Sequence, residues 1–304
     1  MFLGIEIGGT KLQLGLGRGD GQLPASHLWR DAIVAAEGGE GIRRRIEVGL
    51  PQLLNQAGVG RAELRGAGIG FGGPVDDATR SVIKSHHIAG WDGFPLADWV
   101  SELVGVPSAI GNDADVAGLA EALHGAGRRL SPIFYITVGT GVGGGLVIDG
   151  EIYRGVGKGA AEIGHVRPAF PLDDPRRGDI LEMFAAGHGL EKAAAARGLP
   201  ISGKEIGERG VRGDPVCADL LDRATQALAE NICTIIKLLC PRRVIIGGGV
   251  SLIGEEHFFD PIRRYVAERG MAALAGLTDI VPAALGEEVV IHGALALARK
   301  KFGG

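Results

Sequence analysis

Residues 133–165 read IFYITVGTGVGGGLVIDGEIYRGVGKGAAEIGH, and the rest of the chain is organised around this stretch. Residues 133–138 alternate apolar and small side chains, as a half-buried strand does. Residues 139–145 contain five glycines, and the apolar pattern resumes at 146–148 before Asp149-Gly150, a pair typical of a tight turn. We therefore predict two strands joined by a glycine-rich turn.

This glycine-rich turn is a candidate anion site. Glycine has no Cβ to block a ligand, and it adopts positive φ angles at little cost, so backbone N–H groups can converge on a phosphate. Thr140 lies within the run. On this stretch alone an ordinary tight hairpin is an equally good interpretation, and the neighbouring motifs favour the phosphate site.

The composition excludes several classes of protein. The chain has 304 residues, 45% of them hydrophobic, which suffices for about two domains with sizeable cores. A net charge of −4 provides no basic face for nucleic acid, and no run of about 18 apolar residues is available to span a membrane. Because Glu6 stands where a signal peptide would be basic or apolar, we expect a cytoplasmic location.

The beginning of the chain repeats the hairpin pattern. Residues 2–7 are an apolar strand pattern, GGTK follows at 8–11, and a second apolar stretch occupies 12–16. Two such units, one opening each half of the chain, predict a duplicated hairpin that cradles a nucleotide. Glu6, at the first strand's end, is a candidate for holding a metal-bound water; a solvated carboxylate is the alternative for this position alone.

Other predicted strands also end in turns. A strand at 67–71 runs into GGPV at 72–75. A strand at 106–110 runs into GNDAD at 111–115, which opens a helix. In α/β folds ligands bind at the carboxyl ends of strands, so we expect both turns to face a ligand. Helical patterns occupy 38–58, 96–103, 116–125, 180 onward, 214–241, 260–269 and 286–300. The loop at 85–99 carries His86, His87 and Trp91, to which we assign no catalytic role.

Taken in order, the motifs resemble those of one family. The chain carries GIEIGGTK at 4–11, GGPV at 72–75, NDAD at 112–115, GTGVGGG at 139–145, EIGH at 162–165 and GGGVS at 247–251. No single motif is specific, but the six in this order resemble the ROK family of bacterial sugar kinases and sugar-responsive repressors. That family belongs to the actin/hexokinase/Hsp70 superfamily, and the resemblance covers essentially the whole chain.

The resemblance implies an α/β fold of two ribonuclease H-like domains around a deep cleft. The smaller N-terminal domain would comprise residues 1–112 and 286–304, and the larger domain residues 113–285. ATP with Mg²⁺ would lie between the two glycine hairpins and a hexose at the cleft floor. Dimers are common in the family, so we expect a homodimer.

The resemblance also assigns candidate site residues. Asp113 matches the catalytic base, and Glu6 stands where most members have an aspartate that reaches Mg²⁺ through water. The matched sugar-binding residues are Gly73, Asn112, Asp113, Glu162, His165 and Glu182. The matched ATP-binding residues are Gly8, Gly9, Thr10, Lys11, Thr140, Gly141, Gly143, Gly248 and Gly249.

One motif of the family is missing. Most members carry a CxCGxxGC zinc motif between the positions of His165 and Glu182, where this chain has no cysteine. The following segment, LEMFAAG at 181–187, still resembles the family, so we expect Glu182 to be retained and no zinc to be bound. The segment offers Asp173, Asp174 and Asp179, which suit Mg²⁺ or Ca²⁺ better than zinc, and three prolines, at 168, 171 and 175, that can hold it instead.

Several alternatives stay open. Glucose, phosphorylated at its 6-hydroxyl, is favoured because GWDGFPL at 90–96 resembles glucokinase-like members; N-acetylmannosamine, N-acetylglucosamine, fructose and allose remain as acceptors, and polyphosphate as donor. A sugar-sensing repressor would carry a helix-turn-helix domain ahead of the first hairpin, which begins here at residue 2. A dinucleotide-binding dehydrogenase is disfavoured, because GTGVGGG is followed by another apolar strand instead of a helix.

Overall fold

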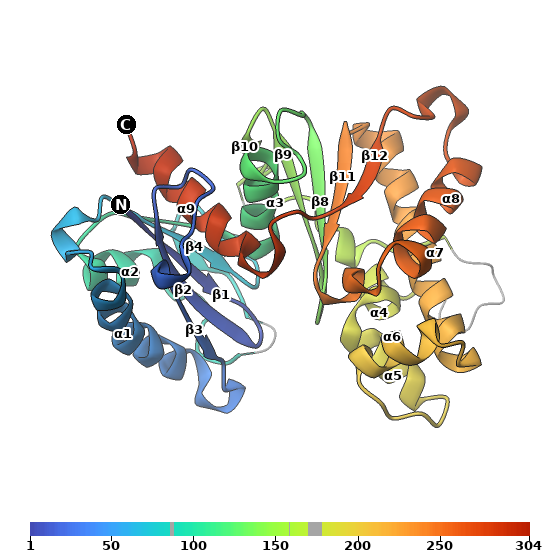
Figure 1. Cartoon of the computed structure of the whole chain (residues 1–304), viewed down its shortest axis with the longest axis horizontal. Helices are drawn as coiled ribbons and strands as arrows, with labels where there is room; N and C mark the ends of the chain where they lie inside the picture. Colours follow the sequence, from blue (N-terminus) through green and yellow to red (C-terminus); the bar gives the residue numbers. More distant parts are fainter. Residues whose placement is uncertain (86–87, 158, 170–177) are drawn as a thin grey trace. The chain divides into compact units, whose positions relative to one another are not determined.

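The computed structural model describes residues 1–85, 88–157, 159–169 and 178–304. The chain divides into two units. The first comprises Met1–Arg129, Gly150–Ala160 and Leu285–Gly304, and the second comprises Leu130–Asp149 and Ala161–Ala284. Each unit combines a mixed sheet with helices, as Figure 1 shows.

The sheet of the first unit begins with a hairpin and continues in parallel. Its strands are β1 (Phe2–Ile7), β2 (Lys11–Gly17), β3 (Leu28–Ala32), β4 (Ala67–Phe71) and β7 (Ser108–Asn112). They lie in the order β3-β2-β1-β4-β7. β1 pairs antiparallel with β2, and β2 with β3, whereas β4 runs parallel to both β1 and β7. The predicted strands are confirmed, and β3 is an additional strand that the sequence did not predict.

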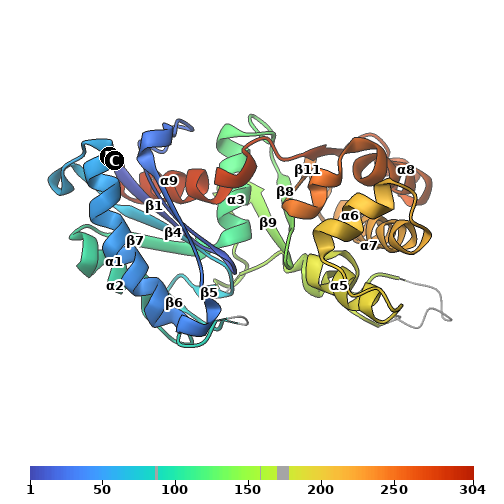
Figure 2. The same ribbon diagram turned by 60° about the horizontal axis from the view of Figure 1, so that its bottom comes forward.

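One face of this sheet is apolar. Leu3, Ile5 and Leu14 point from it into a buried core that they share with α1 (Gly38–Ala57) and α2 (Leu96–Val104). The apolar positions of α1 recur at helical spacing, which is why this stretch was predicted as a helix. Figure 2 shows both helices on the same side of the strands.

The opposite face is lined by glycines. α9 (Val289–Phe302) lies against it and packs on β1 and β4. A Cβ on Gly68 would lie only 1.9 Å from the carbonyl oxygen of Ala294, so a side chain there would displace the helix. The glycines of these strands therefore allow the helix to pack closely against the sheet.

α3 (Asp113–His124) packs against α9 within the first unit. The short strands β5 (Val75–Asp76), β6 (Ser81–Val82) and β10 (Glu151–Ile152) also belong to this unit. The expected domain boundary after residue 112 would group α3 with the other half of the chain; the expected division into domains stays a prediction.

The second unit repeats the strand pattern of the first. Its strands are β8 (Ile133–Val138), β9 (Val142–Ile148), β11 (Arg243–Gly247) and β12 (Asp279–Pro282). β9 pairs antiparallel with β8, and β8, β11 and β12 follow in parallel, in the order β9-β8-β11-β12. The first unit has the same pattern, an antiparallel hairpin followed by parallel strands, in the order β2-β1-β4-β7. The predicted duplication of the hairpin is therefore confirmed.

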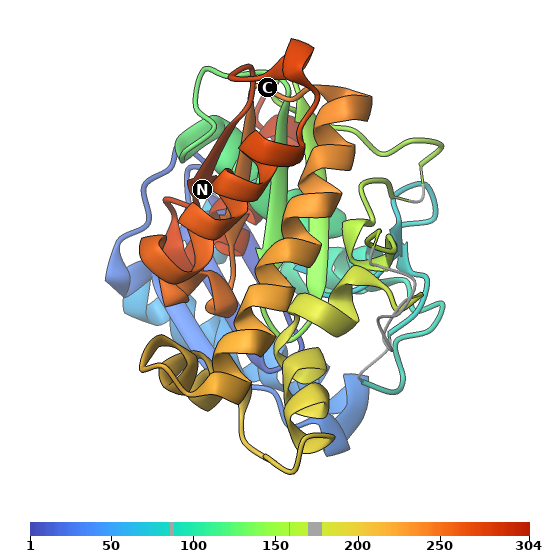
Figure 3. The same cartoon turned by 90° about the vertical axis from the view of Figure 1, so that its right-hand side faces the viewer.

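The described residues of the second unit also form α-helices. They are α4 (Leu181–Ala185), α5 (Gly187–Ala195), α6 (Gly203–Val211), α7 (Pro215–Leu239) and α8 (Asp260–Arg269). α7 runs alongside the strands (Figure 3) and buries Leu220, Leu228 and Ile232 in one cluster with Phe134. Asp214 caps this helix by accepting hydrogen bonds from two backbone N–H groups of its first turn.

The predicted aromatic loop contributes to the core of the first unit. Trp91 is fully buried and packs edge-on against Phe71, with the ring centroids 5.5 Å apart. His86 and His87 lie outside the described residues. Among the helices that the structure describes, none is long and apolar enough to cross a membrane.

Candidate active site

Asn112 joins two predicted site segments of the first unit. It caps α3, because its Oδ1 accepts hydrogen bonds from the backbone N–H groups of Ala114, at 2.9 Å, and Asp115, at 3.4 Å. Its Nδ2 donates to the carbonyl oxygen of Gly73 at 3.0 Å. The GGPV turn and the beginning of α3 are thereby fixed to one another.

Asp113 lies beside the GGPV turn. Its carboxylate is half-buried, and Oδ1 accepts a hydrogen bond from the N–H of Ala114 at 2.8 Å. A Cβ on Gly72 would lie 3.4 Å from Asp113 Oδ2, so glycine leaves this oxygen room. β4 and β7 are parallel neighbours, and the predicted base lies where the carboxyl ends of both strands meet.

Glu6 is buried at the end of β1. Its Oε1 lies 3.3 Å from Lys11 Nζ, whereas Oε2 has no hydrogen-bond partner among the described residues. Burial raises the pKa of Glu6 to about 7, in spite of Lys11, which lowers it. The alternative of a solvated carboxylate is therefore wrong. A buried carboxylate oxygen without a partner fits a cation or the water bound to one.

The turn between β1 and β2 is open at its tip. The N–H of Gly8 donates to the carbonyl oxygen of Lys11 at 3.0 Å, which closes the turn. Gly9 and Thr10 are exposed, and a Cβ on Gly9 would meet no described atom within 4 Å. The ammonium of Lys11 is engaged, since it also donates to the carbonyl oxygen of Glu287 at 2.9 Å.

In the second unit, two glycines of the run 139–145 lie where other segments approach the hairpin closely. All seven residues are described, and none of the glycines has a positive φ. The expectation that positive φ angles shape this turn for an anion is therefore wrong. A Cβ on Gly141 would lie 2.6 Å from Glu182 Oε2, and one on Gly144 would lie 2.3 Å from the carbonyl oxygen of Ala161. Other segments approach the hairpin too closely for any side chain at these positions.

Only the first part of the run forms the turn. The N–H of Gly139 donates to the carbonyl oxygen of Gly141 at 2.9 Å, and Thr140 is exposed at the tip. Gly143 is opposite Thr137 in the ladder between β8 and β9. We call residues 139–141 the nucleotide turn; the ATP-binding role of these residues and of Gly143 stays a prediction.

Glu182 contacts the base of this turn. Its Oε2 accepts a hydrogen bond from the N–H of Val142 at 2.9 Å, and its Oε1 lies 3.9 Å from His188 Nε2. The carboxylate was predicted to bind sugar, and the structure adds a contact with the hairpin that the sequence did not indicate. The sequence also did not point to His188, which belongs to no motif.

The EIGH segment approaches the same residue of β9. A Cβ on Gly164 would lie 2.1 Å from the carbonyl oxygen of Val142, so the segment passes directly over the strand. Glu162 and His165 are exposed, with Glu162 Oε2 and His165 Nδ1 3.7 Å apart. The structure thus brings the three sugar-binding candidates of this unit to the surroundings of Val142.

A cavity of about 820 Å³ lies beside the nucleotide turn within the second unit. Its lining comes from the turn (Gly139, Thr140), from α5 (Gly187, His188, Glu191), from α6 (Gly203, Lys204, Gly207, Glu208, Val211, with Arg212 following) and from the GGGVS segment (Gly249, Val250, Leu252, Ile253). Gly248 has a φ of 88°, and a Cβ there would lie 2.5 Å from the carbonyl oxygen of Val138. The GGGVS turn is therefore held against β8, and α6 is a wall of the cavity that no motif predicted.

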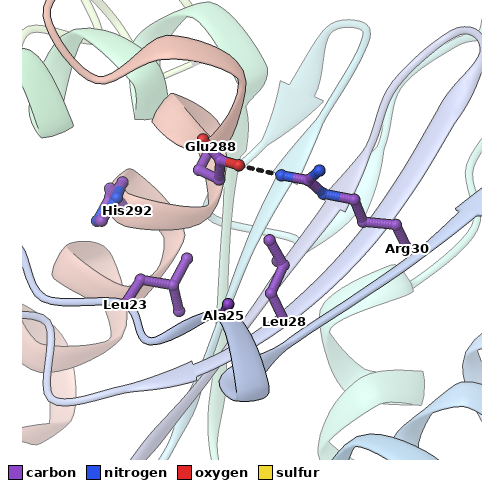
Figure 4. Close-up of a pocket in the computed structure, with 6 residues that line it drawn as sticks. All are labelled: Leu23, Ala25, Leu28, Arg30, Glu288 and His292. Carbon is purple, nitrogen blue, oxygen red and sulfur yellow. Dashed lines mark hydrogen bonds and ion pairs between the residues drawn. The ribbon is translucent and has the colours of Figure 1, made fainter.

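The first unit has a cavity of its own, of about 570 Å³, shown in Figure 4. Leu23, Ala25 and Leu28 form its apolar side, and Arg30 pairs with Glu288 across it. Burial lowers the pKa of His292, which lies one turn further along α9. None of the predicted site residues lines this cavity.

No metal cluster is formed by the residues that the structure describes: they contain no group of three or more His, Cys, Asp or Glu side chains suited to hold an ion. Asp173, Asp174 and the prolines at 171 and 175 lie outside this part of the chain. The expected absence of zinc stays a prediction.

Comparison with known proteins agrees with the motifs. The family model described as ROK family matches residues 2–301. A glucokinase of Thermotoga maritima is 30% identical over 100% of this chain and 98% of its own length, and an N-acetylmannosamine kinase of Escherichia coli is 30% identical over 98% of each. The crystal structure of a ROK family glucokinase from Streptomyces griseus in complex with glucose and AMPPNP is 30% identical, with a TM-score of 0.82 over 98% of this chain and 99% of that one. This likeness confirms the predicted α/β fold of the actin/hexokinase type.

Proposed function

The chain belongs to the ROK family and is a sugar kinase, and from this premise we propose that it transfers the γ-phosphoryl group of ATP to the 6-hydroxyl of glucose. Relatives named glucokinase that match nearly the whole chain support glucose as the acceptor. N-acetylmannosamine kinases reach the same identity, which makes N-acetylmannosamine the runner-up.

Asp113 is the proposed base. The hydroxyl of the sugar gives its proton to the Asp113 carboxylate as its oxygen forms a bond to the γ-phosphorus and the bond from that phosphorus to the β,γ-bridging oxygen of ATP breaks, which releases ADP. Asn112 holds the base in place by its cap on α3 and its bond to Gly73. In phosphoryl transfer the protein does little covalent chemistry itself. Its main contribution is to hold the acceptor and the base in position.

The nucleotide is proposed to bind through backbone groups and the cavity of the second unit. Residues 8–11 and the nucleotide turn would contact the phosphates, with Thr140 and Gly141 as donors. The adenine ring would enter the cavity beside Val250 and Ile253, with Gly249 in the lining and Gly248 packed against β8. Apolar side chains with a few polar groups at the rim are what an adenine site requires.

Glu6 is the residue proposed to hold Mg²⁺, through water. Its buried, unpartnered Oε2 fits a cation, and Lys11 beside it can contact a phosphate when it leaves Glu6. Bound there with ATP, the ion would neutralise negative charge on the phosphates.

The sugar hydroxyls are proposed to be bound by Glu162, His165 and Glu182, together with Asn112 and the backbone at Gly73. Carboxylates accept hydrogen bonds from hydroxyls, whereas an imidazole can accept or donate one, and pairs of such groups give a sugar its orientation.

One observation carries this proposal most directly: Asp113 lies beside the GGPV turn with its neighbour Asn112 tied to Gly73. A coupled assay across glucose, mannose, fructose, allose, N-acetylmannosamine and N-acetylglucosamine, with ATP and polyphosphate as donors, tests it. We expect the highest kcat/KM with glucose and ATP. Preferential turnover of an N-acetylated hexose, or of polyphosphate, would contradict the proposed substrates while leaving the sugar kinase assignment intact.

A further inference from the structure

Three hydrogen bonds from one segment hold the nucleotide turn and the residue that follows it. Besides the bond between Glu182 and Val142, the N–H of Gly187 donates to the carbonyl oxygen of Gly139 at 2.8 Å. The third involves His188, whose Nδ1 lies 2.6 Å from the carbonyl oxygen of Thr140. α4 and α5 therefore contact every part of this turn.

The surroundings of His188 decide where its protons lie. A carbonyl oxygen only accepts, so Nδ1 must carry a proton to bond with Thr140. Nε2 faces Glu182 Oε1 at 3.9 Å, and a carboxylate oxygen also only accepts. The ring is therefore held by the Thr140 carbonyl, and its other nitrogen lies within electrostatic range of the carboxylate without a direct hydrogen bond.

Other charged groups face the same space. Glu191 is on α5 itself, and its Oε1 accepts a hydrogen bond from the N–H of Gly203 at 2.8 Å. From α6 and its end, Lys204, Glu208 and Arg212 line the cavity that His188 also lines. These four side chains share the cavity with His188, and Glu182 faces the ring from α4.

We propose that His188 is a positioning residue that couples the nucleotide turn to the sugar-binding carboxylate of Glu182. This inference rests on the proposed function, because it takes Glu182 to bind the sugar and residues 139–141 to bind phosphate. The ring bonds to the Thr140 carbonyl and faces Glu182. A sugar that orders Glu182 should therefore also order the turn, and a nucleotide that orders the turn should also order Glu182. Coupling of this kind is reciprocal between the two ligands.

The test is calorimetric titration of glucose with and without AMPPNP, at one pH, for wild type and for His188→Asn. Asparagine can still donate to the Thr140 carbonyl, but it carries no charge and is too short to reach Glu182. Both proteins are measured at the same pH, so the protonation of Glu6 affects them equally.

We expect AMPPNP to tighten glucose binding about three- to fivefold more in the wild type than in His188→Asn, the range of a partly exposed electrostatic contact. His257 offers a matched control: its Nε2 also lies 3.9 Å from a carboxylate, that of Glu256, and its side chain has the same 39% exposure as that of His188. His257→Asn should behave as the wild type does.

Two results would overturn the inference. If the wild type phosphorylates its sugar and binds AMPPNP, but AMPPNP tightens its glucose binding no more than it does in His188→Asn, His188 has only a structural role and the proposed function stands. If the wild type binds no hexose at all, the proposed function and this inference fail together.

Discussion

Glu182 accepts a hydrogen bond from the backbone N–H of Val142 at 2.9 Å, and so a carboxylate predicted to bind sugar also holds the base of the nucleotide turn. The close approach requires Gly141, whose Cβ would lie 2.6 Å from the same oxygen. Glu162 differs from Glu182, because its side chain is exposed and lies 3.7 Å from His165 without a described backbone bond.

This difference predicts different consequences for the two glutamates. Glu182→Ala leaves the N–H of Val142 without its partner, at a cost of about 1–3 kcal/mol, so the affinities for glucose and AMPPNP should both fall. Glu162→Ala should weaken glucose binding about tenfold and leave AMPPNP binding nearly unchanged. Separate titrations of each ligand measure this, and a Glu162→Ala variant that loses both affinities equally would mean that the substitution damages the fold.

The pKa of Glu6 predicts a pH dependence of stability. Burial raises that pKa from 4.5 to about 7, so between these values the folded chain binds more protons than the unfolded chain. The free energy of unfolding should therefore fall as the pH rises from about 4.5 to 7 and level off above. Glu6→Gln removes this contribution and should be more stable than the wild type at pH 8, by up to about 3 kcal/mol, with little difference at pH 4.

Urea denaturation in the presence of a chelator and without ligands measures both proteins at each pH. Parallel pH profiles for wild type and Glu6→Gln would show that Glu6 does not titrate in this range. The same variant tests the proposed metal role, since a glutamine holds a hydrated cation less well: the Mg²⁺ concentration for half-maximal activity should rise several-fold, and an unchanged requirement would remove Glu6 from the metal site.

Much of the fold was predictable from the sequence, because it depends on local patterns. The hairpins around residues 8–11 and 139–141 follow from apolar runs broken by glycine, and α7 from its apolar stripe and the Asp214 cap. β3 was missed because its sequence, LWRDA, has half-exposed and exposed side chains typical of a sheet edge. α6 was missed because glycine at 203, 207 and 210 weakens its helical pattern.

The candidate site was predictable in its residues and not in its contacts. The motifs indicated Asp113, Glu162 and Glu182 by resemblance, but a one-dimensional pattern cannot show that Glu182 reaches Val142, forty residues away. It also cannot distinguish a buried strand-end carboxylate from a solvated one, which is why Glu6 had two interpretations. The sequence did not indicate His188, because its proposed role depends on contacts with Thr140 and Glu182, which come from different parts of the chain.

Asn112 should contribute to both stability and catalysis. Asn112→Ala removes the cap of α3 and the bond to Gly73, so the free energy of unfolding should fall by about 1–2 kcal/mol. Asn112→Asp keeps an oxygen for the cap but loses the amide donor, and it should retain most of the stability while the KM for glucose rises. Thermal unfolding with steady-state kinetics compares them; equal stability of Asn112→Ala and wild type would mean that the cap contributes nothing.

We expect the enzyme to need no zinc, since its counterpart of the family's zinc segment offers no cysteine. Purified protein should contain far less than one equivalent of zinc by elemental analysis, and a zinc-selective chelator should leave the activity with Mg²⁺ unchanged. About one equivalent of zinc, together with a loss of activity that Mg²⁺ fails to restore, would contradict this expectation.

The most direct test of the account is the single-turnover rate of Asp113→Asn. Asparagine keeps an oxygen that can accept the hydrogen bond from the Ala114 N–H, so the variant should fold and bind glucose with little change in affinity. It cannot accept a proton from the sugar hydroxyl, and the rate of phosphoryl transfer should fall about 10²- to 10⁴-fold. A variant that binds glucose and transfers phosphate at nearly the wild-type rate would contradict the assignment of Asp113 as the base.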